Sequence, residues 1–299
     1  MMNSPLLTPA ELATLQLTVH ERATRQQVAT TFAAGQHRSR YRGQGVELDD
    51  SRPYHPGDNI RHMDWRATAR SGRATMKVFR EEKQRSLYLL IDRTPSMAFG
   101  TRVRLKIQSA AICALQLAFT ALAHHESVAA AIVDTTIDHY APTRTLDASF
   151  ALINAINAPV STTPSTRMWS HANIMPLLQT IEQRSLPGCS VVVISDFIGL
   201  TAQQARLLAH LNDKRPLTAL QISDPAEHEL PAAGWLRLRS PITGESAWVD
   251  SHNPGVREQF RAHAAQRQQQ LVQQFAQMNV ALQSISTTVD LCTPLEALR

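Results

Sequence analysis

Short apolar runs alternate with segments of helical periodicity from residue 86 onward. Runs of seven or eight mostly apolar residues predict buried strands, because a strand covered on both faces presents no polar side to water. These strands are expected at 86–92, 127–134, 189–196 and 217–223. Between them, apolar residues at helical spacing predict helices at 103–124, 147–157, 172–184 and 201–213. The alternation predicts an α/β fold with a Rossmann-like, mainly parallel sheet flanked by helices.

The C-terminal part predicts a hairpin, a long helix and a last strand. Residues 234–250 resemble a hairpin whose turn lies near Thr243 and Gly244. The Gln-rich stretch 256–278 is amphipathic and predicts a helix. Its core-facing residues are expected to be Phe260, Leu271, Phe275 and Met278. Residues 279–286 predict the final strand.

The N-terminal part differs from the rest in pattern. Leucines and valines at helical spacing predict a helix over residues 8–34. Residues 38–85 consist of short segments rich in Gly, Pro, Arg and Asp, which predict hairpins and ordered loops. We therefore expect an N-terminal helical segment at 1–37, a small β-rich basic appendage at 38–85, and an α/β domain at 86–299.

The net charge of +5 is concentrated in the appendage. Between Arg38 and Arg85, Lys and Arg outnumber Asp and Glu by twelve to seven, which equals the excess of the whole chain. Such a patch attracts nucleic acid or an acidic protein surface. The segment has no run of like charges, however, so pairing of its arginines with the interleaved acids is the favoured interpretation, and nucleic-acid binding is an alternative.

The sequence predicts a cytoplasmic protein without a membrane span. Its longest apolar run, 109–123, is shorter than the ~20 residues that cross a bilayer, and it predicts a buried helix. The N-terminus shows no basic segment followed by an apolar one. Three widely separated cysteines, without a Cys-x-x-Cys pair, fit a reducing compartment.

Oxygen-bearing side chains follow two of the predicted strands. Asp92, Thr94 and Ser96 alternate along the chain, so in an extended conformation they point the same way. Asp196 follows a second strand, at the same kind of strand end. Oxygen ligands of this kind suit Mg²⁺ or Mn²⁺. The structural alternative is that Ser96 caps the next helix while Asp92 accepts backbone hydrogen bonds in a tight turn.

Two motifs together resemble a known family. The stretch "YHPGDNIRHMDWRATARSG" (54–72) resembles the signature of the bacterial domain-of-unknown-function family 58. The trio at 92–96 with Asp196 resembles the metal-ion-dependent adhesion site of von Willebrand factor type A domains. Residues 54–196 carry this resemblance, and the pattern beyond them is compatible with it.

The resemblance implies a von Willebrand type A-like domain and a role. It places a divalent metal at Asp92, Thr94, Ser96 and Asp196, with a partner's carboxylate as a further ligand. The family's intermediate threonine is missing, because "SHAN" (170–173) stands where Gly-Thr-Asp is expected. Thr162, Thr163 and Thr166 are nearby but out of register. A site that keeps the fold without the metal is therefore the alternative.

Members of the family that this chain resembles commonly accompany MoxR-type AAA ATPases. The implied role is a non-enzymatic, chaperone-like adaptor that acts with such an ATPase on client proteins. Within the signature, six residues are candidates for a recognition surface: Tyr54, Asp58, Arg61, Asp64, Trp65 and Arg70. Trp and Arg dominate binding hot spots. The alternative is an internal Arg/Asp network with a packed Trp65.

An enzyme is the remaining alternative. Asp92 and Asp196 around Mg²⁺ would suit a hydrolase or nuclease. The sequence has neither a Gly-x-Ser-x-Gly elbow nor a phosphate-binding loop, so a catalytic function has no motif in its favour.

Overall fold

The chain forms two compact units. The computed structural model describes residues 4–33, 47–55, 60, 63–80, 85–134, 136–159, 171–184, 188–240 and 244–290. One unit comprises Met1–Thr24 and Arg85–Arg299, and the other comprises Arg25–Gln84.

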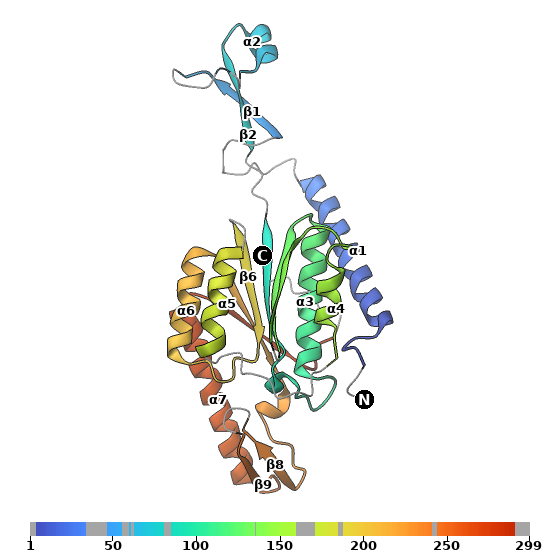
Figure 1. Ribbon diagram of the computed structural model, residues 1–299, viewed down its shortest axis with the longest axis vertical. Coiled ribbons are helices and arrows are strands. Elements are labelled where there is room, and N and C mark those ends of the chain that lie inside the picture. The colour runs from blue at the N-terminus through green and yellow to red at the C-terminus, as the bar shows by residue number, and fades with distance from the viewer. Residues whose placement is uncertain are drawn as a thin grey trace. The chain divides into compact units, whose positions relative to one another are not determined.

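The larger unit is built on a six-stranded sheet with the strand order β10-β7-β6-β3-β4-β5 (Figure 1). Its strands are β3 (Ser86–Asp92), β4 (Ser127–Val133), β5 (Ile137–Thr143), β6 (Cys189–Ser195), β7 (Leu217–Ser223) and β10 (Ala281–Ser286). All neighbouring pairs are parallel except β4 with β5. The predicted α/β fold with a mainly parallel sheet is confirmed. Four of these strands lie where the apolar runs predict them, and β10 lies within the predicted last strand at 279–286.

The strand β5 was not predicted. It is an edge strand, antiparallel to β4, and its residues are half-buried or exposed. It includes Asp138 and His139, so it lacks the continuous apolar run of a strand that is buried on both faces.

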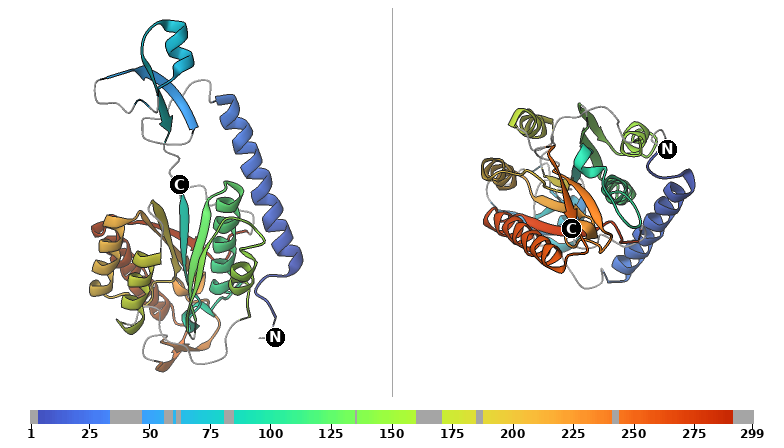
Figure 2. Two further views of the ribbon diagram at one scale, coloured as in Figure 1. Left: turned by 45° about the horizontal axis from the view of Figure 1, so that its top comes forward. Right: turned by 90° about the horizontal axis from the view of Figure 1, so that it is seen from below.

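Helices cover both faces of the sheet (Figures 1 and 2). One face packs against α3 (Lys106–Ala123) and α4 (Phe150–Ile156), and the first half of α1 (Pro9–Ala33) joins the same hydrophobic cluster from outside. The other face packs against α5 (His171–Arg184), α6 (Ala202–Lys214) and α7 (Pro254–Gln277). In α7, Phe275 and Met278 at its end are buried as predicted, whereas Phe260 and Leu271 are half-buried.

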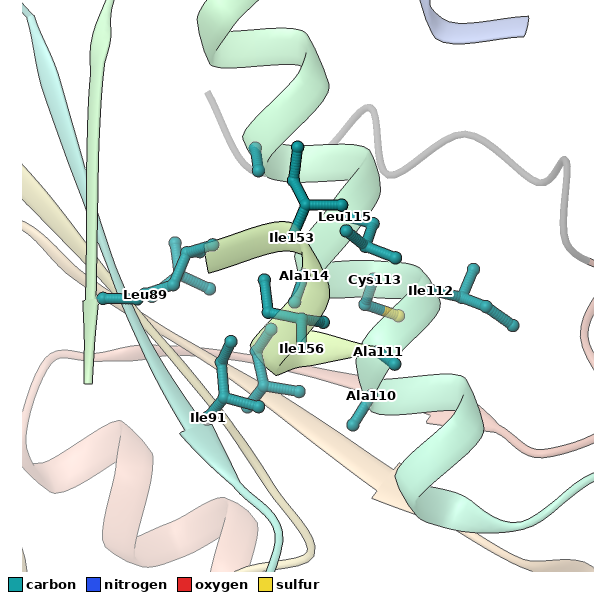
Figure 3. Packing of buried hydrophobic residues seen from close by; sticks show 14 of the residues in the cluster. Leu89, Ile91, Ala110, Ala111, Ile112, Cys113, Ala114, Leu115, Ile153 and Ile156 are labelled. Carbon is teal, nitrogen blue, oxygen red and sulfur yellow. The ribbon is translucent and has the colours of Figure 1, made fainter. Parts of the chain in front are cut away.

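The helix α3 is the centre of the first core. Its residues from Ala110 to Leu115 belong to one buried cluster with Leu89 and Ile91 of β3 and with residues of α4, and within it Ile112 points away from β3 (Figure 3). Among the described residues, α3 is also the one helix that is long and apolar enough to cross a membrane, but 78% of it is buried inside the unit. It therefore forms part of the core, as the sequence predicts for 109–123.

A hairpin lies between β7 and α7. After β7 the chain forms the short 3-10 helix η3 (Pro225–Glu227) and then the antiparallel strands β8 (Trp235–Arg239) and β9 (Ser246–Asp250). This hairpin was predicted. Since η3 follows β7, the hairpin is attached at the carboxyl-terminal edge of the sheet (Figure 1).

The smaller unit contains β1 (Glu47–Pro53) paired antiparallel with β2 (Thr75–Arg80). Between them lies the helix α2 (Trp65–Ser71), which was not predicted because turn residues surround it. The helix starts at Asp64, whose Oδ1 accepts hydrogen bonds from the N–H groups of Arg66 and Ala67. It ends at Gly72, whose φ of 66° is readily adopted by glycine.

Candidate functional site

The candidate site lies where the strand order reverses. From β3 the chain continues to β4 and β5 on one side of β3, and it then returns to β6 on the other side. The neighbouring strands β3 and β6 therefore flank a topological switch point. Ligands of open α/β sheets bind outside the carboxyl ends of strands at this point. Asp92 ends β3, and Asp196 directly follows β6. Both aspartates are buried.

The predicted trio comes together around Asp92. Its Oδ1 accepts hydrogen bonds from the backbone N–H of Thr94 at 2.9 Å and from the Thr94 hydroxyl at 2.6 Å. Its Oδ2 accepts one from the Ser195 hydroxyl at 2.6 Å. The hydroxyl oxygens of Thr94 and Ser96 lie 3.4 Å apart. Strands β3 and β6 thus fix both oxygens of one carboxylate.

A turn, rather than an extended chain, brings these groups together. After Thr94 the chain enters the 3-10 helix η2 (Pro95–Met97), so Ser96 lies within that helix. The prediction that Ser96 caps the following helix is therefore wrong, since the N-cap of α3 is Leu105. The tight turn at Asp92, with its backbone hydrogen bond from Thr94, is present.

The Asp92 carboxyl is electrostatically unusual. Burial, together with the nearby charge of Asp196, raises its pKa from 3.8 to about 6. The hydrogen bonds from Ser195 and Thr94 act in the opposite direction but do not compensate fully. Among the described residues no cationic side chain forms a hydrogen bond or ion pair with this carboxylate.

Asp196 is held by an ion pair that the sequence did not predict. The Lys106 ammonium donates hydrogen bonds to Asp196 Oδ2 at 2.7 Å and to Glu227 Oε1 at 2.6 Å. Asp196 Oδ1 accepts the backbone N–H of Ile198. Burial alone would lower the pKa of Lys106, but the two carboxylates raise it. A lone lysine at the start of an apolar helix is the signal in the sequence that points to this pair.

A third buried aspartate follows β7. Asp224 accepts hydrogen bonds from the backbone and hydroxyl of Thr101, from the Thr287 hydroxyl and from the N–H of Ala226. Burial would raise its pKa, but these hydrogen bonds lower it. Asp224 thereby fastens the loop before α3 and the end of β10 to the carboxyl edge of the sheet.

Replacing Asp224 by alanine is expected to destabilise the protein by about 2–3 kcal/mol, because several buried donors lose their acceptor. Urea unfolding followed by circular dichroism measures this effect. Glu229→Ala is the control, since Glu229 is an exposed carboxylate in the same loop and its loss should change stability by less than about 0.5 kcal/mol. Equal unfolding midpoints for the two variants would contradict the assigned role of Asp224.

Arg93 faces away from the trio, as alternation along the strand predicts. Its guanidinium donates to the carbonyls of Ala155, Ile156, Ala158 and Pro159 at the end of α4. Its Nε lies 3.6 Å from Asp134 Oδ2. Arg93 therefore closes a helix end and leaves the oxygen cluster free of its charge.

Several predicted positions lie outside the described residues. Among them are Thr162, Thr163, Thr166, Asp58 and Arg61, and of 171–173 the structure describes only the helical backbone. Of the other signature residues, Tyr54 is half-buried, Arg70 is exposed and Trp65 is 64% exposed. Asp64 has a local structural role as the N-cap of α2.

Replacing Asp64 by alanine is expected to destabilise α2 by about 1 kcal/mol through the loss of its cap. Hydrogen exchange of the α2 amides in the full chain measures the loss directly. Asp64→Asn is the control because it keeps the capping oxygen and should exchange like the parent. If α2 in the alanine variant exchanges no faster than in the parent, the cap does not stabilise the helix.

The trio suits a hard cation better than Asp196 does. Asp92, Thr94 and Ser96 offer oxygen atoms, and a hydroxyl that donates to Asp92 keeps lone pairs for a metal. Both oxygens of Asp196 are engaged, one by Ile198 and the other by the Lys106 ammonium. In the part of the chain that the structure describes, no three His, Cys, Asp or Glu side chains form a metal-binding group. Among the described residues, the trio is therefore the group best suited to hold a cation.

Comparison with known proteins gives a family and several relatives. Residues 50–270 match the model of a family described as "Protein of unknown function DUF58". The uncharacterized protein Rv1480 of Mycobacterium tuberculosis is 27% identical over 259 residues, which cover 86% of this chain and 78% of the relative.

Two solved structures resemble the chain more distantly. An aerotolerance-related membrane protein from Bacteroides fragilis has a TM-score of 0.40 and 13% identity, over 68% of this chain and 92% of that one. The conserved hypothetical protein BatB from Bacteroides thetaiotaomicron has a TM-score of 0.37 and 14% identity, over 65% of this chain and 98% of that one.

Proposed function

The chain belongs to the family of proteins of unknown function DUF58, and from this premise we propose that it is a non-enzymatic protein-interaction module. Its binding site is the oxygen cluster of Asp92, Thr94 and Ser96, and its ligand is a carboxylate of a partner protein, bound through Mg²⁺ or Mn²⁺. The observation that carries this proposal is the buried Asp92, whose two oxygens are fixed by hydroxyl groups at the switch point of the sheet.

Each residue of the cluster has a defined task. Asp92 supplies the negative charge, and Ser195 and Thr94 hold its carboxylate in one orientation. The hydroxyls of Thr94 and Ser96 supply neutral oxygen ligands beside it. When bound, a divalent cation offers open coordination positions to a carboxylate. With Asp92 as the one charged ligand of the cluster, a divalent cation would keep a net positive charge, which favours an anionic ligand from outside.

The surroundings of the cluster support a protein ligand. Phe99 and Val103, in the loop after Ser96, are 41% and 60% exposed. At the same edge of the sheet, the hairpin carries the exposed Trp235 and Trp248. Exposed large apolar side chains of this kind are typical of protein-binding surfaces.

The partner that we propose is a MoxR-type AAA ATPase together with a client protein, in a chaperone-like adaptor role in the cytoplasm. The support for this choice is the family signature at 54–72. The smaller unit, with its exposed Trp65 and Arg70, would supply a second contact surface. Trp and Arg are the residue types that contribute most at interfaces.

Two measurements test the proposal. Mg²⁺ and Mn²⁺ are titrated calorimetrically into metal-stripped parent, Asp92→Ala and, as the control, Asp213→Ala, which alters an exposed carboxylate on α6. Co-elution with the ATPase is then measured with and without EDTA. We expect metal binding and co-elution to persist in Asp213→Ala and to be lost in Asp92→Ala. Co-elution that is unaffected by Asp92→Ala and by EDTA would contradict the metal-dependent interaction.

The alternative functions make different predictions. A hydrolase or nuclease that uses Asp92 and Asp196 predicts turnover in a phosphatase and nuclease screen with Mg²⁺. Asp196, which that alternative requires as a free carboxylate, is paired with Lys106. Nucleic-acid binding through residues 38–85 predicts a gel shift that weakens steeply with salt.

A further inference from the structure

A lysine side chain lies fully buried beside the oxygen cluster. Lys106 is the first residue of α3, and its side chain has 0% exposure. Its ammonium joins Asp196, after β6, to Glu227, in η3. A residue 90 positions away in sequence and another 121 positions away therefore meet on one cation.

This position is unfavourable for a lysine unless the negative charges beside it compensate. Taking an ammonium out of water is costly, and fully buried lysines are rare. The first turn of a helix also carries the positive end of the helix dipole, which repels a cation. Asp196 and Glu227 supply the compensation, and the ring of Phe99 lies 6.0 Å from the ammonium.

The ion pair determines what Asp196 can bind. Its Oδ1 accepts the N–H of Ile198, and its Oδ2 accepts the ammonium at 2.7 Å. An incoming divalent cation would have to displace the ammonium or approach against its positive charge. Asp92 differs, because its described donors are hydroxyl and amide groups that carry no net charge.

We propose that Lys106 is the resident cation of this site and limits its affinity for divalent metals. The ammonium neutralises the charge of Asp196 and occupies the position that a metal ion would need. Asp196 is therefore not a metal ligand in the parent protein. The site keeps its shape without metal, and a metal binds only through the side of Asp92, Thr94 and Ser96. This inference extends the metal site of the proposed function.

Mn²⁺ titration of metal-stripped protein tests the inference. Replacing Lys106 by methionine removes the charge but keeps a long apolar side chain. We expect Lys106→Met to bind Mn²⁺ at least about tenfold more tightly than the parent, because the competing charge is gone and Asp196 becomes free. Its melting temperature should also rise more with added Mn²⁺ than that of the parent. Adding Asp196→Asn to Lys106→Met should remove this gain.

A second variant protects the test against misfolding. Lys106→Met removes the cation that neutralises the buried Asp196 and the half-buried Glu227, so Lys106→Met/Glu227→Gln is prepared beside it to remove one of the two uncompensated charges. Folding is checked by circular dichroism before each titration. If the folded variants bind Mn²⁺ no more tightly than the parent, the inference is overturned.

The Mn²⁺ affinity of the single variant Asp196→Asn, with Lys106 in place, tests the inference independently. We expect it to leave Mn²⁺ affinity within about twofold of the parent, whereas a direct metal ligand would cost at least about tenfold. Such a loss would overturn the inference. A parent that binds no metal, together with lysine variants that do, would support the role of Lys106 while refuting the metal-dependent proposed function.

Discussion

In metal-free buffer at pH 8, the Asp92→Asn variant is expected to be more stable than the parent by about 1–2 kcal/mol. The parent must keep a buried carboxylate ionised next to Asp196, and burial with that neighbouring charge raises the Asp92 pKa to about 6. A neutral amide of the same shape avoids this cost. The gain is incomplete, because an amide nitrogen facing Ser195 would disturb the hydrogen bond that Ser195 now donates.

The contribution of Asp92 to the free energy of unfolding falls as the pH rises. The pKa of Asp92 rises from 3.8 to about 6 on folding, so the folded state binds its proton more tightly than the unfolded state does. The resulting stabilisation is complete below about pH 4 and is lost as the pH rises through 6. The parent should therefore lose this contribution between pH 4 and 6, and Asp92→Asn should not.

Urea unfolding at pH 4, 6 and 8 in the presence of EDTA measures both effects. Asp196→Asn is the matched control, because it replaces the other aspartate of the site by the same isostere. It leaves the buried Lys106 with one carboxylate fewer, so it should destabilise the protein by about 2–4 kcal/mol. If Asp92→Asn and Asp196→Asn were destabilised to the same extent, the claim that Asp92 destabilises the fold while Asp196 stabilises it would be wrong.

The opposite expected changes in stability show that the two buried aspartates of the site differ in their electrostatic role. The charge of Asp196 is compensated within the chain, since the ammonium of Lys106 pairs with it. Asp92 receives hydrogen bonds but no opposite charge from the described residues, and it destabilises the folded state at neutral pH. A buried charge that destabilises the fold in this way is a candidate for function, because an external cation would relieve its cost.

The fold could be predicted largely because its central strands are buried on both faces. Strands such as β3 and β4 are buried along their whole length, and this produces continuous apolar runs in the sequence. The edge strand β5 lacks such a run. The helix α2 was missed for a different reason, since its start depends on the Asp64 cap and its seven residues are too few for a clear period.

The candidate site could be predicted only in part. Asp92 and Asp196 follow apolar strands, so their placement at one edge of the sheet could be inferred from the sequence. Asp224 follows the predicted strand 217–223 in the same way and was overlooked. The pairing of Lys106 with Asp196 and Glu227 depends on contacts between distant parts of the chain, which periodicity and spacing do not encode.

Replacing Gly100 by alanine is expected to destabilise the protein by about 2–3 kcal/mol. A Cβ at this position would lie 2.7 Å from the backbone Cα of Leu105 and closer still to the carbonyl oxygen of Arg104, so the loop before α3 would have to open. That loop carries Thr101, which binds Asp224, and its Phe99 carbonyl accepts the N–H of Lys106. Urea unfolding measures the loss.

Gly255→Ala in α7 is the control, because its Cβ would approach only Asn253 Oδ1 at 3.3 Å. The change in the free energy of unfolding should stay within about 0.5 kcal/mol. A Gly100→Ala variant as stable as this control would show that the loop adjusts freely and does not fix Lys106 in place.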